Sequence, residues 1–298
     1  MPAETSPFPA SRVLNLFNSN GGNIAEGGTI SIQVPTGTFQ ADSDIVFRIH
    51  NEADQAPGGT IGGVDGFGGI SGIVSALSTD SSLDSAIFNQ GGSFSSGASI
   101  DWSFGNVTIA GEASFRILNQ DSGNGFGGGN IAGDALIDIS SSTGFSAGTI
   151  LAQINNLGGT IGGSSAINFE SDLGELRANQ NATFEILEDA SNEAGSSIFV
   201  SANSISTGGS LIAKIANTET SFDFDNVSVN ANDTITVGNQ LLVDGTVEAG
   251  GDISATNGIS VAGDLTSDAG DITSTNGDIT VGGNIAATGD PSLVAARW

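Results

Sequence analysis

The stretch DTITVGNQLLVDGTVEAGG (Asp233–Gly251) is followed by two related copies, DISATNGISVAGDLTSDAG (Asp252–Gly270) and DITSTNGDITVGGNIAATG (Asp271–Gly289), each 19 residues long. Tandem repeats of about this length are typical of solenoids. Within each copy, apolar residues alternate with small polar ones, as in Ile259–Leu265. A period of two is the pattern of a half-buried strand, so the repeat predicts stacked β-strands.

A longer repeat precedes these copies. Its most regular feature is an aliphatic residue followed two positions later by Asn, with Glu in place of Asn in the sixth copy. The copies are Leu16–Asn18, Ile49–Asn51, Ile87–Asn89, Ile117–Asn119, Ile154–Asn156, Ile186–Glu188 and Ile215–Asn217, at steps of 29 to 38 residues. Glycine-rich turns recur as well, because GGTIGG occurs at Gly58–Gly63 and again at Gly158–Gly163. Repeats of this length predict wide solenoid coils of about 33 residues.

Together the two repeats predict the fold class. We expect an all-β, right-handed parallel β-helix whose wide coils of about 33 residues give way to narrow coils of about 19. Stacked coils place like side chains above one another and form one continuous core. We expect residues 1–12 to form an extended arm or cap, 13–219 the wide coils, 220–290 the narrow coils, and 291–298 a tail or truncated continuation. An uncapped last coil exposes an unpaired edge, which favours a longer native chain or end-to-end association.

Charge and composition exclude several partners. The chain has 33 acidic and 6 basic residues, a net charge of -27, and its basic residues stand singly. Binding to nucleic acid needs clustered Lys and Arg, so we expect no nucleic-acid partner. No apolar run approaches the roughly 18 residues of a membrane span, so we expect no membrane insertion. The sequence contains no Cys and one His, which excludes disulfides and thiolate metal sites.

Three segments resemble a known family of repeat proteins. They are Phe47–Gly63 (FRIHNEADQAPGGTIGG), Ala152–Phe169 (AQINNLGGTIGGSSAINF) and Asp252–Asp290, which contains the last two narrow copies. These segments resemble the repeat regions of very large bacterial surface proteins of the filamentous haemagglutinin type. The resemblance implies an exported β-helical rod that acts as an adhesin or surface fibre, located outside the cell or on the bacterial cell surface. It implies a cell-surface ligand such as a glycan as the partner. The first 22 residues lack a basic segment followed by an apolar one, so we expect no secretory signal peptide there.

Recurrent aspartates are the candidate metal ligands. Asp233, Asp252 and Asp271 open successive narrow coils and lie above one another if the register holds. Stacked carboxylates repel unless a cation offsets them, and Ca²⁺ takes oxygen ligands, so calcium is the cofactor that this row suggests. The alternative is that each Asp caps a turn by bonding to backbone. We favour the turn, because the GGxGxD array of calcium-binding rolls is missing from the sequence.

Recurrent asparagines predict a second row. Asn51, Asn89, Asn119, Asn156 and Asn217 hold equivalent positions of the wide repeat. We expect each amide to bond to the next coil in an internal or corner ladder. Such a ladder satisfies buried backbone groups and therefore predicts a scaffold role for these residues.

A glycan-degrading enzyme is an alternative function, because such enzymes share the β-helix architecture. Glycoside hydrolysis needs paired carboxylates, but no two Asp are adjacent in this sequence. Arg48 and Arg116 hold equivalent repeat positions, with Glu185 in a third copy, which indicates an outward strand face, and a solitary surface histidine such as His50 is usually inert. Gly123–Gly128 matches GxGxxG, but a strand pattern follows it where a dinucleotide site needs a helix, so we interpret it as a loop. The sequence therefore predicts no enzyme and no catalytic residue.

The sequence-based hypothesis is a non-enzymatic, extracellular β-solenoid rod of an adhesin or surface fibre. Specificity would reside in the two longest interruptions of the coil, Asp54–Gly69 and Gln120–Gly129. One alternative is a filament subunit that stacks coil to coil, which predicts fibres that form at high protein concentration. The glycan-degrading enzyme predicts instead a cleft lined by several carboxylates from adjacent coils.

Overall fold

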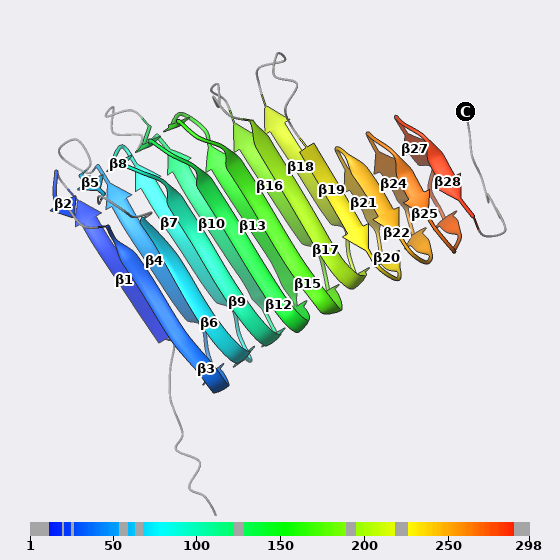
Figure 1. Cartoon of the computed structure of the whole chain (residues 1–298), viewed down its shortest axis with the longest axis horizontal. Coiled ribbons are helices and arrows are strands. Elements are labelled where there is room, and N and C mark those ends of the chain that lie inside the picture. The colour runs from blue at the N-terminus through cyan, green and yellow to red at the C-terminus, as the bar shows by residue number, and fades with distance from the viewer. Residues whose placement is uncertain are drawn as a thin grey trace, which may run out of the picture.

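The structure is a computed structural model that describes residues 12–19, 21–24, 27–53, 59–62, 68–121, 128–188, 195–217 and 226–288. Every regular element in these segments is a strand, and the named strands pair in parallel. Figure 1 shows strands of successive coils side by side, from the blue β1 to the red β28. The chain is thus an all-β parallel β-helix, as predicted, whereas the predicted handedness and coil lengths stay predictions. None of the described segments forms a helix long and apolar enough to cross a membrane.

The strands form three sheets, here named A, B and C. Sheet A has ten strands: β1 (Arg12–Ser19), β4 (Ile45–Glu52), β7 (Leu83–Gln90), β10 (Glu112–Gln120), β13 (Thr149–Asn156), β16 (Ala182–Glu188), β18 (Leu211–Asn217), β21 (Gln240–Val243), β24 (Gly258–Val261) and β27 (Ile279–Val281). Sheet B has five two-residue strands: β2 (Asn23–Ile24), β5 (Thr60–Ile61), β8 (Ser93–Phe94), β11 (Asn130–Ile131) and β14 (Thr160–Ile161).

Sheet C has thirteen strands and forms the second long wall of the solenoid. They are β3 (Thr29–Ala41), β6 (Gly68–Thr79), β9 (Ala98–Ile109), β12 (Ala135–Ala147), β15 (Ser165–Ala178), β17 (Ser196–Thr207), β19 (Asn226–Ala231), β20 (Ile235–Val237), β22 (Thr246–Ala249), β23 (Ile253–Ala255), β25 (Leu265–Ser267), β26 (Ile272–Ser274) and β28 (Ile285–Ala287).

Sheet A aligns the repeated asparagine motif. Leu16 pairs with Ile49, Ile49 with Ile87, and the series continues to Ile215. Along β4 buried and half-buried residues alternate strictly, because successive side chains point to opposite faces of a sheet. The unequal steps of the repeat are therefore taken up outside this sheet, in the connections between strands.

The long strands of sheet C bend at equivalent positions, and in later coils the chain forms two separate strands on the two sides of that position. The pairing of β12 with β15 shifts in register between Ser141 and Phe145, and a bulge of this kind bends a strand. In the next coils β17 pairs with β19 over its first part and with β20 over its last part. From there on the chain turns where the earlier strands only bend. Three coils each contribute two short strands to sheet C, namely β19 with β20, β22 with β23, and β25 with β26, and β28 follows.

The core around Trp102 shows how the interior is filled. Trp102 is buried, and its indole Nε1 donates a hydrogen bond to Ser85 Oγ at 3.1 Å. Ser85 stands between Phe47 and Phe115 in the inward row of sheet A, where it provides space that a third Phe would occupy. Gly72 pairs with Trp102 in sheet C, and a Cβ there would collide with the indole. Two small residues therefore make room for one large one, as close packing requires.

The predicted domain boundaries fall mostly outside the described residues. The change from wide to narrow coils was expected at residues 219 and 220, and the described residues stop at 217 and resume at 226. The predicted arm is described only at Arg12, the first residue of β1, and the predicted tail at 291–298 is not described.

Candidate functional site

An asparagine ladder runs through the corner between sheets A and B. Each Nδ2 donates to the Oδ1 of the asparagine in the next coil: Asn18 to Asn51 (3.0 Å), Asn51 to Asn89 (2.9 Å), Asn89 to Asn119 (2.7 Å) and Asn119 to Asn156 (2.7 Å). The same four amides also donate to backbone carbonyls of sheet B strands in the next coil. All five side chains are buried. The ladder satisfies the corner backbone, so these residues serve the scaffold.

Recurring glycine pairs, among them the first two glycines of each GGTIGG motif, lie against this ladder. A Cβ on the second glycine of each pair would collide with a ladder amide, and these glycines are Gly59, Gly92, Gly129 and Gly159. The first glycine of the pair turns the chain. Gly91 and Gly158 have φ angles of 75° and 83°, which residues other than glycine rarely adopt. The recurring glycine pair is thus explained by the turn and by the close approach of the ladder.

The ladder ends where the repeat substitutes Glu for Asn. Glu188 pairs with Asn156 in sheet A and is buried. The Nδ2 of Asn156 has no hydrogen-bond partner, whereas a Glu188 carboxylate oxygen accepts from Ser196 Oγ at 3.0 Å. The side chain of Asn217, the last predicted member, lies outside the described residues.

The predicted aspartate row is level only in part, because Asp252 aligns with Asp271 whereas Asp233 is out of register by one residue. Ile235 follows Asp233 by two residues and pairs with Ile253, which follows Asp252 by only one. Asp252 Oδ1 accepts a hydrogen bond from the backbone N–H of Asp271 at 2.8 Å. Within the described part of the chain, no group of three or more His, Asp and Glu side chains could hold a metal ion. Calcium binding at these aspartates stays an untested prediction.

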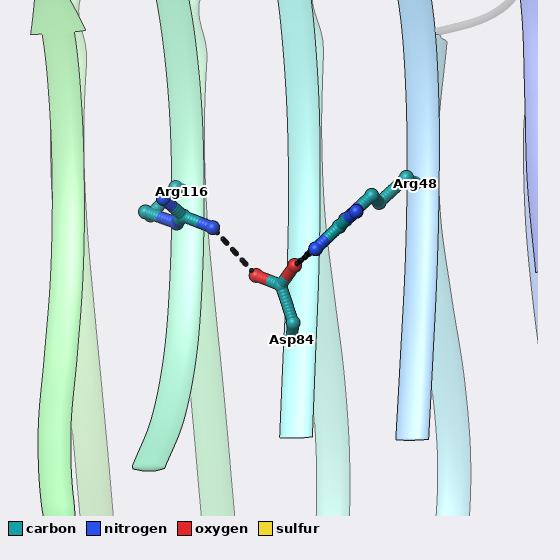
Figure 2. A network of polar contacts seen from close by, with 3 residues as sticks. All are labelled: Arg48, Asp84 and Arg116. Carbon is teal, nitrogen blue, oxygen red and sulfur yellow. Dashed lines mark hydrogen bonds and ion pairs between the residues drawn. The ribbon is translucent and has the colours of Figure 1, made fainter. Parts of the chain in front are cut away.

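The outward face of sheet A carries a network of three charges. Asp84 on β7 accepts hydrogen bonds from Arg48 Nε (2.7 Å) and Nη2 (2.5 Å) through one carboxylate oxygen, and from Arg116 Nη2 (2.9 Å) through the other. Figure 2 shows the carboxylate held between guanidinium groups from β4 and β10. The Asp84 side chain is 13% exposed, which reduces solvent screening of the two ion pairs. The outward position predicted for the arginines agrees with this geometry.

An open hollow lies beside this network. Its volume is about 320 Å³, and it is lined by Asp44, Val46, Arg48, Ser82, Leu83, Asp84, Glu112, Ser114 and Arg116. These residues come from the beginnings of β4, β7 and β10 and from the turns that precede them. Sequence reasoning identified Arg48 and Arg116 but missed Asp84, because Asp84 stands two residues before the position equivalent to the arginines, which is Ala86.

The single histidine lies in an aromatic stack on the same face. The His50 ring stacks on Phe17 at a centroid distance of 4.5 Å and on Phe88 at 4.7 Å. Its Nδ1 lies 2.6 Å from a carboxylate oxygen of Glu52. The ring is therefore held by packing on both of its faces and by its contact with Glu52.

Two carboxylates meet on the outward face of sheet C. Asp101 on β9 pairs in register with Asp138 on β12. Burial raises the pKa of Asp138 above its ordinary value, and the nearby charge of Asp101, a smaller cause, raises it further. Asp101 also lines a second open hollow of about 370 Å³, formed with Ser31, Ile32, Gln33, Ser71, Gly72, Ile73 and Ser103. Asp138 is not part of its lining, so this hollow presents a single carboxylate.

We expect the Asp138→Asn variant to be more stable than the wild type at pH 7. The pKa of this carboxyl is higher in the folded state than in the unfolded state. At pH values between these two pKa values, the folded state therefore binds more protons than the unfolded state. Wild-type stability therefore rises as the pH falls through this window, and the advantage of the variant shrinks. Urea denaturation from pH 3 to pH 7 measures the difference, and an advantage that grows toward low pH would contradict the assignment.

The loops predicted to carry specificity lie largely outside the described residues. Of Asp54–Gly69 the structure describes residues 59–62 and 68–69, and of Gln120–Gly129 it describes 120–121 and 128–129. The GxGxxG match at Gly123–Gly128 is likewise outside, except for its last glycine. The interpretation of these segments as binding loops stays a prediction.

Comparisons with known proteins give no relative from which to transfer a function. No protein-family model matches the chain, and no match is found among curated proteins or solved structures.

Proposed function

We propose that the chain is a non-enzymatic, extracellular rod of a bacterial adhesin or surface fibre, of the filamentous haemagglutinin type. The observation that carries this proposal is the unbroken stacking of ten parallel strands in sheet A, whose outward side chains face solvent in rows. A solenoid of this kind holds surface residues at a fixed spacing along its length, and the extended surface it offers is suited to binding.

The shape of the described surface supports binding over catalysis. Both hollows are open, and each lies on the outer face of a sheet. Catalysis of glycan hydrolysis uses two carboxyl groups on opposite sides of the scissile bond. In the sheet C hollow, Asp101 is the one carboxylate of the lining. The sheet A hollow is lined by three acidic residues, Asp44, Asp84 and Glu112, and the carboxylate of Asp84 is ion-paired with Arg48 and Arg116.

A self-assembling filament is the second candidate, and exposed apolar residues near the two ends of the described solenoid favour it. Leu14 and Phe17 on β1 are 46% and 63% exposed, and Ile285 on β28 is 44% exposed. Strands at the end of a sheet have unpaired backbone groups that can pair with another chain. Contact between the ends of two molecules would cover these side chains and extend the sheets.

Electron microscopy of the purified chain over a range of protein concentrations, with and without Ca²⁺, tests this proposal. Short rods that do not lengthen with concentration are expected for an adhesin segment. Long uniform fibres would contradict the adhesin proposal and favour the filament subunit. Antibody labelling of intact cells of the encoding organism, before and after external protease, tests the location. Labelling that requires permeabilised cells would overturn the proposed extracellular role.

A further inference from the structure

The outward residues of three neighbouring strands form one continuous polar surface. Arg48 on β4 pairs with Ala86 on β7, and Ala86 pairs with Arg116 on β10. Ala86 points outward yet is fully buried. A side chain as small as Ala leaves space above β7, and the guanidinium groups on its two sides meet Asp84 in that space (Figure 2). The arginines therefore lean toward the beginnings of the strands, where the hollow lies.

The hollow offers hydrogen-bond donors and acceptors in close succession. Its acidic groups belong to Asp44, Asp84 and Glu112, and its basic groups to Arg48 and Arg116. Ser82 and Ser114 add hydroxyl groups to the same lining. Its volume of about 320 Å³ lies at the lower end of the range for small-molecule sites.

Two polar atoms of the lining residues have no partner. Ser114 is 2% exposed, and its hydroxyl makes no hydrogen bond. The Nε of Arg116 is also buried without an acceptor, although its Nη2 bonds Asp84. Buried donors without acceptors cost free energy, which a bound group that supplies acceptors would recover. Neither atom takes part in the ion pairs of Asp84.

The mixture of charges selects the class of ligand. Three acids and two arginines do not favour a free anion, and the net charge of -27 disfavours one further. A cation would meet the two guanidinium groups. A sugar hydroxyl donates one hydrogen bond and accepts two, which matches carboxylates and guanidinium groups placed side by side. We infer that the hollow binds an uncharged sugar unit, an inference that rests on the proposed adhesin function and names its ligand class.

The aromatic stack on the same face extends the surface beyond one sugar. His50 lies two residues along β4 from Arg48, and Phe88 lies two residues along β7 from Ala86. The stack ends at the exposed ring of Phe17. Apolar ring surface next to a polar hollow suits the C–H groups and hydroxyls of neighbouring sugar units. The ligand class is therefore a neutral oligosaccharide that runs across the outer face of sheet A.

An array of defined neutral, uronic-acid and sialic-acid oligosaccharides, followed by titration calorimetry with the best neutral binder, tests the site. Wild-type protein is expected to bind neutral oligosaccharides, and Arg116→Gln and Arg48→Gln are each expected to weaken binding by about tenfold or more. Lys214→Gln is the matched control. It breaks the ion pair of Lys214 with Glu185 (2.6 Å) on the same face, outside the hollow, and is expected to leave the affinity within about twofold.

Each outcome has a distinct meaning. No binding to any neutral oligosaccharide, a preference for the acidic ones, or equal losses in Lys214→Gln and Arg116→Gln would overturn the inference. Circular dichroism of every variant confirms that the β-structure is retained. Short rods without sugar binding would refute the site and leave the rod proposal intact. Sugar binding by a chain that does not reach the cell surface would refute the proposed function and leave the site intact.

Discussion

Replacing Trp102 by Ala is expected to lower the free energy of unfolding by about 3–5 kcal/mol, the usual cost of removing a large buried aromatic side chain. The indole is 1% exposed, contacts Phe47 at a ring-centroid distance of 5.2 Å and stacks on Phe104 at 5.4 Å. Its loss leaves a cavity and removes the donor to Ser85 Oγ. Urea denaturation followed by far-UV circular dichroism measures the effect.

Two further variants make this prediction specific. Phe199→Ala removes a half-buried aromatic side chain from the outward face of the same sheet, so we expect it to cost much less. Gly72→Ala alone should destabilise, because its Cβ collides with the indole. In the Trp102→Ala background the same Cβ occupies vacated space, so the two changes should be less than additive. Equal losses in Trp102→Ala and Phe199→Ala, or full additivity with Gly72→Ala, would contradict the packing described here.

Replacing Asn89 by Ala is expected to cost about 2–4 kcal/mol of stability, from one or two unpaired buried polar groups and the loss of linked hydrogen bonds. Asn89 is fully buried in the middle of the ladder. It accepts from Asn51 at 2.9 Å, and it donates to Asn119 Oδ1 at 2.7 Å and to the carbonyl of Asn130 at 3.3 Å. The same denaturation experiment measures the loss.

Asn106→Ala is the matched control for the ladder. Asn106 lies on β9 and is exposed, so its substitution is expected to change stability by less than about 0.5 kcal/mol. Asn89→Asp, which keeps the shape but removes the two amide donors, should destabilise as well. A loss in Asn89→Ala no larger than that in Asn106→Ala would mean that the ladder contributes nothing to stability.

The sequence predicted much of the scaffold and little of the surface site. The Leu16 to Ile215 series marks the pairing of sheet A because each coil must place the same apolar face toward the core. The asparagine ladder was predicted for the same reason, but Asn18, its first member, was missed. At the other end, Asn156 Nδ2 finds no acceptor in the next coil. The aspartate row was harder to place, because consecutive narrow coils are not aligned by one constant step. Ile235 pairs with Ile253 at a step that leaves Asp233 out of level with Asp252.

The surface site depends on contacts between residues that the repeat does not align. Arg48 and Arg116 were recognised as equivalent positions, but their common partner Asp84 lies on the coil between them and two residues earlier in its strand. Writing the three coils in the register of sheet A would have placed Asp84 next to both arginines. The Asp101 and Asp138 pair was missed for a related reason, because the predicted search for adjacent acids concerned neighbours in the sequence and these two are neighbours across strands.

The amino-acid sequence alone determined that the chain is built of strands, that the strands stack in parallel coils, and which residues form the inward rows. These properties follow from a periodicity of two and from spaced repeats, which act locally and in every coil alike. Only the tertiary structure decided which outward side chains meet. Contacts such as Arg48 with Asp84 join residues more than thirty positions apart in the sequence, and they depend on the size of the intervening side chain and on the reach of its neighbours.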